Sequence, residues 1–379
     1  MKIVIAPDSF KESLTAKQVC TAIETGFKRV FPDATYYSIP VSDGGEGTVQ
    51  SLVDATQGKI VELTVTGPLG TPVQTFYGLL GDNNQTAAIE MAAASGLHHV
   101  PAELRDPKKT SSYGTGELIK AALDQGVKKI IIGLGGSATN DGGIGMLSAL
   151  GIAFTDANNN KIETNGAGLQ QIKNINIDAL DPRLKECEIM VACDVDNPLC
   201  GELGASEVFG PQKGATNEDI EYLDKSLKHY GECIKQQFNI DVLNQAGAGA
   251  AGGMGAALLA FTGAQLKPGI ELVLEAVQFK QYMKDTDLVL TGEGKIDEQT
   301  IYGKTPMGVA RIAKQFDIPV IGIAGSLGKN HQAVYDCGID AVFAAIPGAI
   351  SLQQAFAEAN DNIENLAENI AQVWSLKQK

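Results

Sequence analysis

The chain has 379 residues, enough for two or three domains with separate cores, and its net charge is −15. This acidity argues against nucleic-acid binding, because affinity for the phosphate backbone depends on Lys and Arg. The six cysteines form no C-x-x-C pair and indicate free thiols in a reducing compartment, the cytoplasm. The N-terminal residues do not resemble a secretory leader, and no apolar run reaches about 20 residues, so we expect no membrane partner.

The first predicted element is a buried strand over residues 2–6, followed by a polar segment and an amphipathic helix over 16–30. The polar segment contains Asp8 and Lys11. Ligands of open α/β sheets bind at the carboxyl ends of the strands, so these two residues are candidates for contacting an anion or a metal. A solvated turn with a helix cap explains them equally well.

A second strand is predicted over 35–40, and a glycine-rich turn then leads into a helix over 49–56. Asp43 and Glu46 lie on that turn. Carboxylates favour a helix start through the helix dipole, which is a sufficient structural reason for them. Two carboxylates on such a turn also suit Mg²⁺, and both interpretations stay open.

The pattern then changes from alternating strands and helices to neighbouring strands. A strand is predicted over 59–66, and two more, over 73–80 and 86–91, flank a turn, which is typical of a hairpin. A second domain therefore begins near residue 67. A helix ending near Leu123 follows.

Residues 129–143 form a predicted strand, glycine-rich loop and helix start. Asn140 and Asp141 are favourable N-cap residues for a helix over 143–150. Loop N–H groups and the helix dipole together suit a phosphate or carboxylate. Residues 133–138 also match the G-x-G-x-x-A dinucleotide fingerprint weakly, and a turn that needs glycine only for its dihedral angles is a third interpretation.

A strand over 188–192 runs into Asp194 and Asp196. The spacing of two places both carboxylates on one side of an extended chain, as a metal ligand and a general base require. An Asx-rich turn is the structural alternative. A long polar-faced helix is predicted over 217–238.

The simple alternation returns toward the C-terminus. The predicted elements there are helices over 256–261 and 270–282, a strand over 287–291 ending in a loop at 292–297, a helix over 307–315, strands over 319–324 and 341–346, and a helix over 352–374. We therefore predict a doubly wound, flavodoxin-like α/β domain made of residues 1–66 and 287–379, interrupted by a mixed α/β domain over 67–286.

The glycine-rich loops carry acids and lysines, and this combination fits phosphoryl transfer. Lysines and N–H groups bind phosphates, carboxylates hold Mg²⁺, and one carboxylate accepts a hydroxyl proton. Gly303-Lys304-Thr305 matches the end of a Walker A loop, but Glu298 stands where its first glycine belongs and Pro306 follows at once. The residues alone lead no further than this reaction class.

Six ordered motifs resemble those of the bacterial class I glycerate kinases. They are Pro7-Asp-Ser-Phe-Lys11, Ser42-Asp-Gly-Gly-Glu-Gly-Thr48, Gly133-Leu-Gly-Gly-Ser-Ala-Thr-Asn-Asp141, Ala192-Cys-Asp-Val-Asp-Asn-Pro-Leu199, Phe209-Gly-Pro-Gln-Lys-Gly-Ala215 and Thr291-Gly-Glu-Gly-Lys-Ile-Asp-Glu-Gln-Thr300. The resemblance covers essentially the whole chain, with a small departure at Glu12, where glycine is common. It implies phosphorylation of D-glycerate by ATP and Mg²⁺ in a cleft between a flavodoxin-like domain and an inserted one, with the 2-hydroxyl favoured over the 3-hydroxyl.

The resemblance also suggests residue roles. Asp194 would be the general base, and Lys11 would neutralise charge on phosphate or substrate. The metal candidates are Asp43, Asp196, Glu293 and Asp297. The substrate- and phosphate-binding candidates are Asp8, Ser9, Gly44, Gly45, Gly135, Gly136, Ser137, Asn140, Lys213, Gly292, Gly294 and Lys304.

Two other functions and the assembly stay open. An NAD(P)-dependent dehydrogenase of a small hydroxy acid would use the fingerprint at 133–138, and a non-catalytic protein would bind nucleotide without turnover. The expected assembly is a monomer or homodimer.

Overall fold

The computed structural model describes residues 1–376, and the chain divides into two compact units. Unit 1 contains residues 1–43, residues 50–57 and the segment from Pro268 onward, whereas unit 2 contains residues 44–49 and 58–267. Within the described residues, no helix combines the length and apolar character needed to cross a membrane. All six cysteines are free thiols.

Unit 1 is built on a parallel sheet of five strands within the described residues. Its strands are β1 (Lys2–Pro7), β2 (Thr35–Ser38), β11 (Leu288–Ile296), β12 (Val320–Leu327) and β13 (Ala341–Ala344). Their spatial order is β2-β1-β11-β12-β13, which is the flavodoxin-like order 2-1-3-4-5 when these strands are counted along the chain. The predicted doubly wound fold is confirmed.

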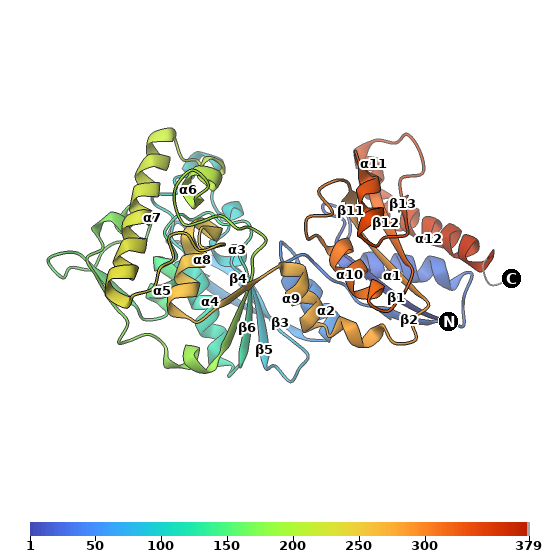
Figure 1. The fold of residues 1–379 in the computed structure, drawn as a ribbon, viewed down its shortest axis with the longest axis horizontal. Helices are drawn as coiled ribbons and strands as arrows, with labels where there is room; N and C mark the ends of the chain where they lie inside the picture. The colour runs from blue at the N-terminus through green and yellow to red at the C-terminus, as the bar shows by residue number, and fades with distance from the viewer. Residues whose placement is uncertain (377–379) are drawn as a thin grey trace. The chain divides into compact units, whose positions relative to one another are not determined.

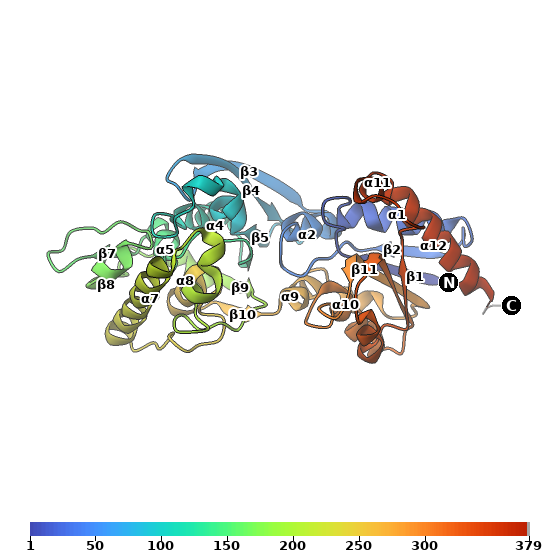
Figure 2. The ribbon, with the colours of Figure 1, turned by 90° about the horizontal axis from the view of Figure 1, so that it is seen from above.

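Both faces of this sheet are covered. The helices of unit 1, with α2 beginning in unit 2, are α1 (Ala16–Lys28), α2 (Thr48–Thr56), α9 (Gly269–Ala276), α10 (Thr305–Lys314), α11 (Leu352–Ala357) and α12 (Ala359–Ser375). Helices α1 and α12 lie side by side (Figures 1 and 2), and Arg29 after α1 pairs with Glu364 and Glu368 of α12. Ile3 and Ile5 of β1 belong to the core against these helices. Val4, between them, points to the opposite face and is also fully buried, as a doubly wound sheet requires.

Unit 2 contains a mixed sheet with the order β10-β9-β6-β5-β4-β3. Its strands are β3 (Lys59–Thr66), β4 (Pro72–Leu79), β5 (Thr86–Glu90), β6 (Lys129–Gly133), β9 (Glu188–Ala192) and β10 (Gln265–Lys267), and a separate pair is formed by β7 (Ala153–Thr155) and β8 (Asn174–Asn176). Strands β3, β4 and β5 are antiparallel neighbours, whereas β5, β6, β9 and β10 are parallel.

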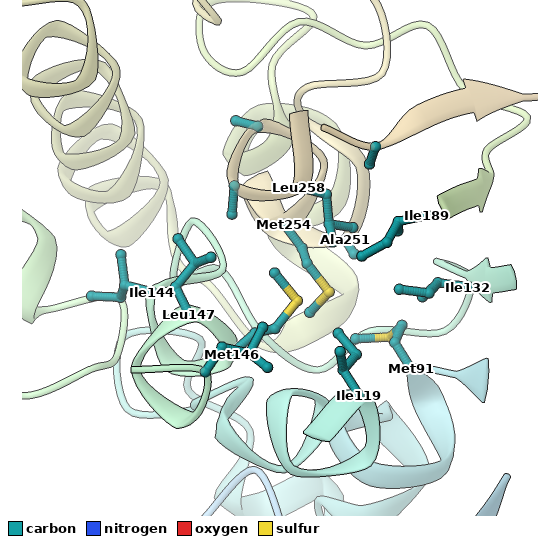
Figure 3. Close-up of a cluster of buried hydrophobic side chains, with 14 of the residues drawn as sticks. Met91, Ile119, Ile132, Ile144, Met146, Leu147, Ile189, Ala251, Met254 and Leu258 are labelled. Carbon is teal, nitrogen blue, oxygen red and sulfur yellow. The ribbon is translucent and has the colours of Figure 1, made fainter. Parts of the chain in front are cut away.

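The helices of unit 2 pack around an apolar core. They are α3 (Ala92–Ser95), α4 (Tyr113–Asp124), α5 (Ile144–Ala149), α6 (Ala205–Phe209), α7 (Asn217–Phe238) and α8 (Ala250–Phe261). Figure 3 shows Ile132 of β6, Ile189 of β9, Met146 of α5 and Met254 of α8 in this core. Helix α7 also contacts β8 of the separate strand pair (Figure 2).

The unit boundaries differ from the predicted ones at two elements. The sequence placed residues 59–66 in the first domain, but β3 pairs with β4 along its whole length, from Lys59 opposite Leu79 to Thr66 opposite Pro72. The sequence placed residues 270–282 in the inserted domain, but α9 packs against α10 of unit 1. Strand pairing decides the first placement, and helix packing decides the second.

Two predicted boundaries near the C-terminus were wrong. Residues 292–296 continue β11 instead of forming a loop, because they pair with β12 as far as Ile296 opposite Leu327. The single helix predicted over 352–374 is two helices that meet at Glu358. Ser351 caps the first, its hydroxyl accepting the Gln354 N–H at 3.2 Å.

Candidate active site

The carboxyl edge of the unit 1 sheet gathers three predicted site acids. Asp8 follows β1, and its N–H donates to the carbonyl oxygen of Gly292 on the neighbouring strand β11 at 2.8 Å. Glu293 is the next residue of β11. Asp43, which follows β2, acts electrostatically on both Asp8 and Glu293 and raises the pKa of each. We call Asp8, Asp43 and Glu293 the acid cluster.

Asp8 is held by hydroxyl and backbone donors. Thr305 Oγ1 donates to Asp8 Oδ2 at 2.5 Å, and the Ser9 N–H donates to Oδ1 at 2.6 Å. Burial and the negative charge of Asp43 nevertheless raise the pKa of Asp8 to about 7. A cation near Asp8 would therefore stabilise a carboxylate that the protein alone disfavours.

Glu293 has a basic partner as well as a hydroxyl donor. Thr300 Oγ1 donates to Glu293 Oε1 at 2.6 Å, and Lys304 Nζ lies 3.5 Å from Oε2. Burial raises the pKa of Glu293 although both partners lower it.

Lys304 also marks the start of a helix. It is the N-cap residue of α10, and Thr305 is the first helical residue. The Gly-Lys-Thr sequence that fails as a Walker A loop thus still places a lysine and a hydroxyl at a helix N-terminus beside two acids. This arrangement suits a phosphate group.

The predicted metal residues differ in their surroundings. Asp297 Oδ2 pairs with Lys295 at 2.9 Å and Oδ1 accepts the Gln299 N–H, so this carboxylate has partners in its own turn and its pKa is lowered. Asp196 belongs to unit 2, whereas Asp43 and Glu293 belong to unit 1. Within residues 1–376, no three or more Asp, Glu, His or Cys side chains form a ready metal site.

In unit 2, two predicted glycine loops lie together at the carboxyl edge of the sheet. A Cβ placed on Gly133, the last residue of β6, would lie 2.7 Å from the carbonyl oxygen of Gly44. A Cβ on Gly135 would lie 3.9 Å from Gly45 Cα. Glu90, at the end of the neighbouring strand β5, accepts the Val49 N–H at 2.8 Å and so anchors the segment that follows Gly44 and Gly45.

The loop after β6 is fixed at several points. The Leu97 N–H donates to the Gly136 carbonyl oxygen, the Ala138 N–H donates to the Ser95 carbonyl oxygen, and Thr110 Oγ1 donates to the Ala138 carbonyl oxygen at 2.8 Å. Gly135 and Gly136 are exposed, and Gly136 has φ of 74°, a left-handed conformation that favours glycine. Ser137, by contrast, is buried. The backbone of Gly135 and Gly136 is therefore exposed to solvent in a loop whose conformation is held by these hydrogen bonds.

Several polar residues of this region are buried, including two that the sequence predicts to bind substrate or phosphate. Asn140 and Asp141 are fully buried, and neither is the N-cap of α5, which begins after Gly143. Asp141 Oδ2 accepts the N–H and the hydroxyl of Ser112. Lys213, predicted to contact phosphate, is buried and donates from Nζ to the Thr139 carbonyl oxygen at 2.6 Å.

Burial also controls the charge of Lys213. It lowers the pKa of Lys213 to about 7, although the negative charge of Asp141 opposes this shift. We interpret Lys213 as a support of the loop after β6.

Asp194 and Asp196 are exposed and follow β9, whose last residue, Ala192, lies opposite Gly133 of β6. The carboxyl ends of these neighbouring parallel strands thus bring Asp194 and the glycine loop to one edge of the sheet. Burial is the main cause of the raised pKa of Cys193, and the negative charges of both aspartates raise it further.

Three residues of these sites were missed from the sequence. Thr300 and Thr305 bond the acids of unit 1, and Glu90 anchors the 44–49 segment of unit 2. The Gly-Lys-Thr sequence was a signal for Thr305. Glu90 lies near the end of a predicted strand, but its partner lies 41 positions earlier in the chain, so the sequence carried no local signal for it.

The fold and the groups at these two sheet edges fit an α/β phosphotransferase. A model of the "Glycerate kinase family" matches residues 3–375. The chain therefore belongs to the glycerate kinase family, and the predicted resemblance is confirmed.

Individual relatives of known sequence or structure match this chain over nearly its full length. The chain is 58% identical over 377 residues to a glycerate kinase of Haemophilus influenzae, covering 100% of both chains. It is 57% identical over 371 residues to a glycerate 2-kinase of Escherichia coli K12, covering 98% of this chain and 97% of that one. A crystal structure of a protein assigned as glycerate kinase 2 from Salmonella typhimurium LT2 superposes with a TM-score of 0.93 at 56% identity, covering 100% and 99% of the two chains.

Proposed function

We propose that this protein transfers the γ-phosphoryl group of ATP to the 2-hydroxyl of D-glycerate. The observation that carries the proposal is the acid cluster beside Lys304 at the start of α10, in a chain that matches glycerate kinases from end to end. Phosphoryl transfer depends on positioning and on neutralising charge, and these residues supply both. The name of the E. coli relative, a glycerate 2-kinase, supports the 2-position.

On unit 1, Lys304 and the N-terminus of α10 would bind ATP phosphates, and Lys11 would neutralise transferred charge. Asp43 and Glu293, with Asp8, would hold Mg²⁺ together with those phosphates. The acid cluster fits a cation because its carboxylates repel one another: Asp43 raises the pKa of both Asp8 and Glu293, and a positive ion would relieve that repulsion. Mg²⁺ is usually held by one or two carboxylates plus substrate phosphates, so a complete protein cage is not required. The ion would supply neutralisation of the charge on the phosphoryl oxygens.

On unit 2, the exposed glycines of the loop after β6 would bind the carboxylate of glycerate through backbone N–H groups. Asp194 would accept the proton of the substrate hydroxyl, and Asp196 is a second exposed carboxylate two positions further along the chain. Asp194 is exposed just beyond the carboxyl end of β9, where a substrate can reach it.

The geometry disfavours the dehydrogenase alternative. In a dinucleotide fingerprint the glycine turn opens directly into a helix. Here the match ends at Ala138, whereas α5 begins at Ile144, and the residues between them are buried and irregular. NADH binding without ATP turnover would revive that alternative.

The free cysteines are consistent with a reducing compartment, and we propose the cytoplasm as the site of action.

The direct test is a coupled ADP-release assay with D-glycerate and other small hydroxy acids, followed by phosphorus NMR of the product. We expect glycerate-dependent ADP release that disappears when Mg²⁺ is chelated, and a 2-phosphate signal. ATP binding without glycerate-dependent ADP release would leave a non-catalytic nucleotide-binding protein, and a 3-phosphate signal would correct the regiochemistry.

The base assignment has its own test. Replacing the proposed base by Asp194→Asn removes the proton acceptor but keeps the shape, so kcat should fall by about 100-fold or more. The exposed Asp33, on unit 1, offers a matched control, and Asp33→Asn should keep the wild-type rate. Near-full turnover by the Asp194 variant would show that another group is the base.

A further inference from the structure

A pocket opens at the carboxyl edge of the unit 1 sheet, beside the ends of β11 and β12 and the residues that follow β13. Its empty volume is about 510 Å³, open mouth included, which is within the range of small-molecule sites. Helices α11 and α12 contribute the opposite wall through Ala355, Phe356 and Ile363. No residue of this wall has been given a role above.

The walls are chiefly apolar, with a few polar groups. Phe10, Ile346, Phe356 and Ile363 supply apolar surface, and Asn362 supplies a side-chain amide. Within the described residues, that side-chain amide makes no hydrogen bond, whereas the backbone N–H of Asn362 donates to the Glu358 carbonyl oxygen. A flat apolar ring with hydrogen-bonding edges matches such walls, whereas a small hydrophilic anion does not.

The position of the pocket connects it to the acid cluster. Lys11 and Gly294 line it, and Gly294 directly follows Glu293 along β11. A Cβ on Gly294 would lie 3.6 Å from the Lys11 backbone nitrogen, so the two segments are in contact range. A nucleotide whose base fills the pocket would therefore leave it past Lys11 and Gly294, toward Glu293 and Lys304.

We propose that this pocket binds the adenine ring of ATP, with Asn362 hydrogen-bonding the edge of the base. An amide donor and acceptor side by side match the adjacent amino group and ring nitrogen of adenine, the pairing that Asn makes with adenine in nucleic acids. The inference deepens the proposed function, since it names the site of the phosphoryl donor's base.

The test uses two equivalent substitutions on helix α11. Ala355 lines the pocket and is half-buried, whereas Ala357, two positions further on, is exposed and lies outside it. Leucine is compatible with a helix at both positions. Ala355→Leu should weaken ATP binding, measured by calorimetry without glycerate, by at least about tenfold, because the added atoms occupy the space of the base. Ala357→Leu should bind ATP like the wild type.

A second measurement tests recognition of the base. Asn362→Leu should lower the preference for ATP over GTP by about tenfold, the loss expected for a hydrogen bond of about 1.4 kcal/mol, while the KM for glycerate stays constant. A purely structural role would change both nucleotides equally. Thermal melting of each variant checks that it is folded.

The possible outcomes separate this inference from the proposed function. Wild-type ATP affinity in Ala355→Leu would overturn the pocket assignment while glycerate-dependent ADP release still stood. Absence of such release in the wild type, together with ATP binding that Ala355→Leu weakens, would overturn the kinase function and support the pocket. An unchanged ATP-to-GTP preference in Asn362→Leu would overturn the role of Asn362.

Discussion

Asp8 carries a carboxyl group whose charged form is disfavoured in the unliganded protein. Its folded-state pKa of about 7 exceeds the ordinary value of 3.8, so the folded state binds more protons than the unfolded state between these two pH values. This acid therefore lowers the free energy of unfolding progressively as pH rises from about 4 to 7. Below about pH 4 it has no effect, and above pH 7 the full cost is present.

Asp8→Asn should remove this cost. We expect the variant to gain stability relative to the wild type as pH rises from 5 to 8, measured by urea unfolding without nucleotide. Parallel pH profiles for the two proteins would contradict the raised pKa. Burial also raises the pKa of Glu293 in both proteins, so the difference between the two pH profiles is the quantity to compare.

Single residues show how far sequence reasoning reaches. Asp8 was a candidate because it follows a strand, although a solvated turn explained it equally well, and the structure places it beside Gly292 of β11, the strand that also carries Glu293, the ion-pair partner of Lys304. Lys213 was a candidate for binding substrate or phosphate because it lies in a motif that resembles the family, but the structure buries it against the Thr139 carbonyl oxygen, 74 positions away. Glu12 has φ of 65°, a left-handed conformation that favours glycine, the residue that the resemblance led us to expect at that position.

Strand β11 offers a test at the level of a secondary-structure element. A Cβ on Gly292 would lie 1.9 Å from the Ile323 carbonyl oxygen of β12, whereas one on Gly294 would have no contact closer than 3.6 Å. Gly292→Ala should therefore lower the free energy of unfolding by about 1–3 kcal/mol, and Gly294→Ala should change it by about 0.5 kcal/mol or less. Chemical denaturation measures both. Equal losses would mean that β12 does not approach β11 as described.

The loop after β6 permits a similarly specific change. A methyl group on Gly135 meets nothing nearer than 3.9 Å, so Gly135→Ala should fold normally but obstruct an anion on the exposed backbone. We expect the KM for glycerate to rise by about tenfold with little change in the KM for ATP, measured by steady-state kinetics. A selective rise in the KM for ATP would instead assign this loop to the phosphates.

The positions of the helices and strands were easier to predict from the sequence than the residues at which they end. Apolar periodicity located β1, α1, β9 and α7, because each buries its own side chains. It failed at residues 292–296, whose glycines suggested a loop, because the partner strand β12 decides their conformation. The sequence pattern also gave no sign of β10, which has only three residues and lies at the edge of its sheet.

At the scale of the whole molecule, unit 2 is nearly one continuous stretch with its own core and sheet. A fragment of residues 58–267 should therefore fold alone and unfold cooperatively on heating, measured by circular dichroism. It should lack kinase activity, because Asp8, Glu293 and Lys304 are absent. A non-cooperative transition would show that residues 44–49 or unit 1 are needed to stabilise it.

Unit 1 has the opposite organisation, and this has a consequence for its biosynthesis. Strand β1 lies between β2 and β11, and Thr291 Oγ1 of β11 donates to the Ala6 carbonyl oxygen across 285 positions of chain. At 5–20 residues per second, a ribosome needs roughly 15 to 60 s to make the partner that β1 requires. During that interval one edge of an apolar strand is unsatisfied while the whole of unit 2 is being synthesised. Newly made chains should therefore need chaperone protection at their N-terminal strand more than anywhere else.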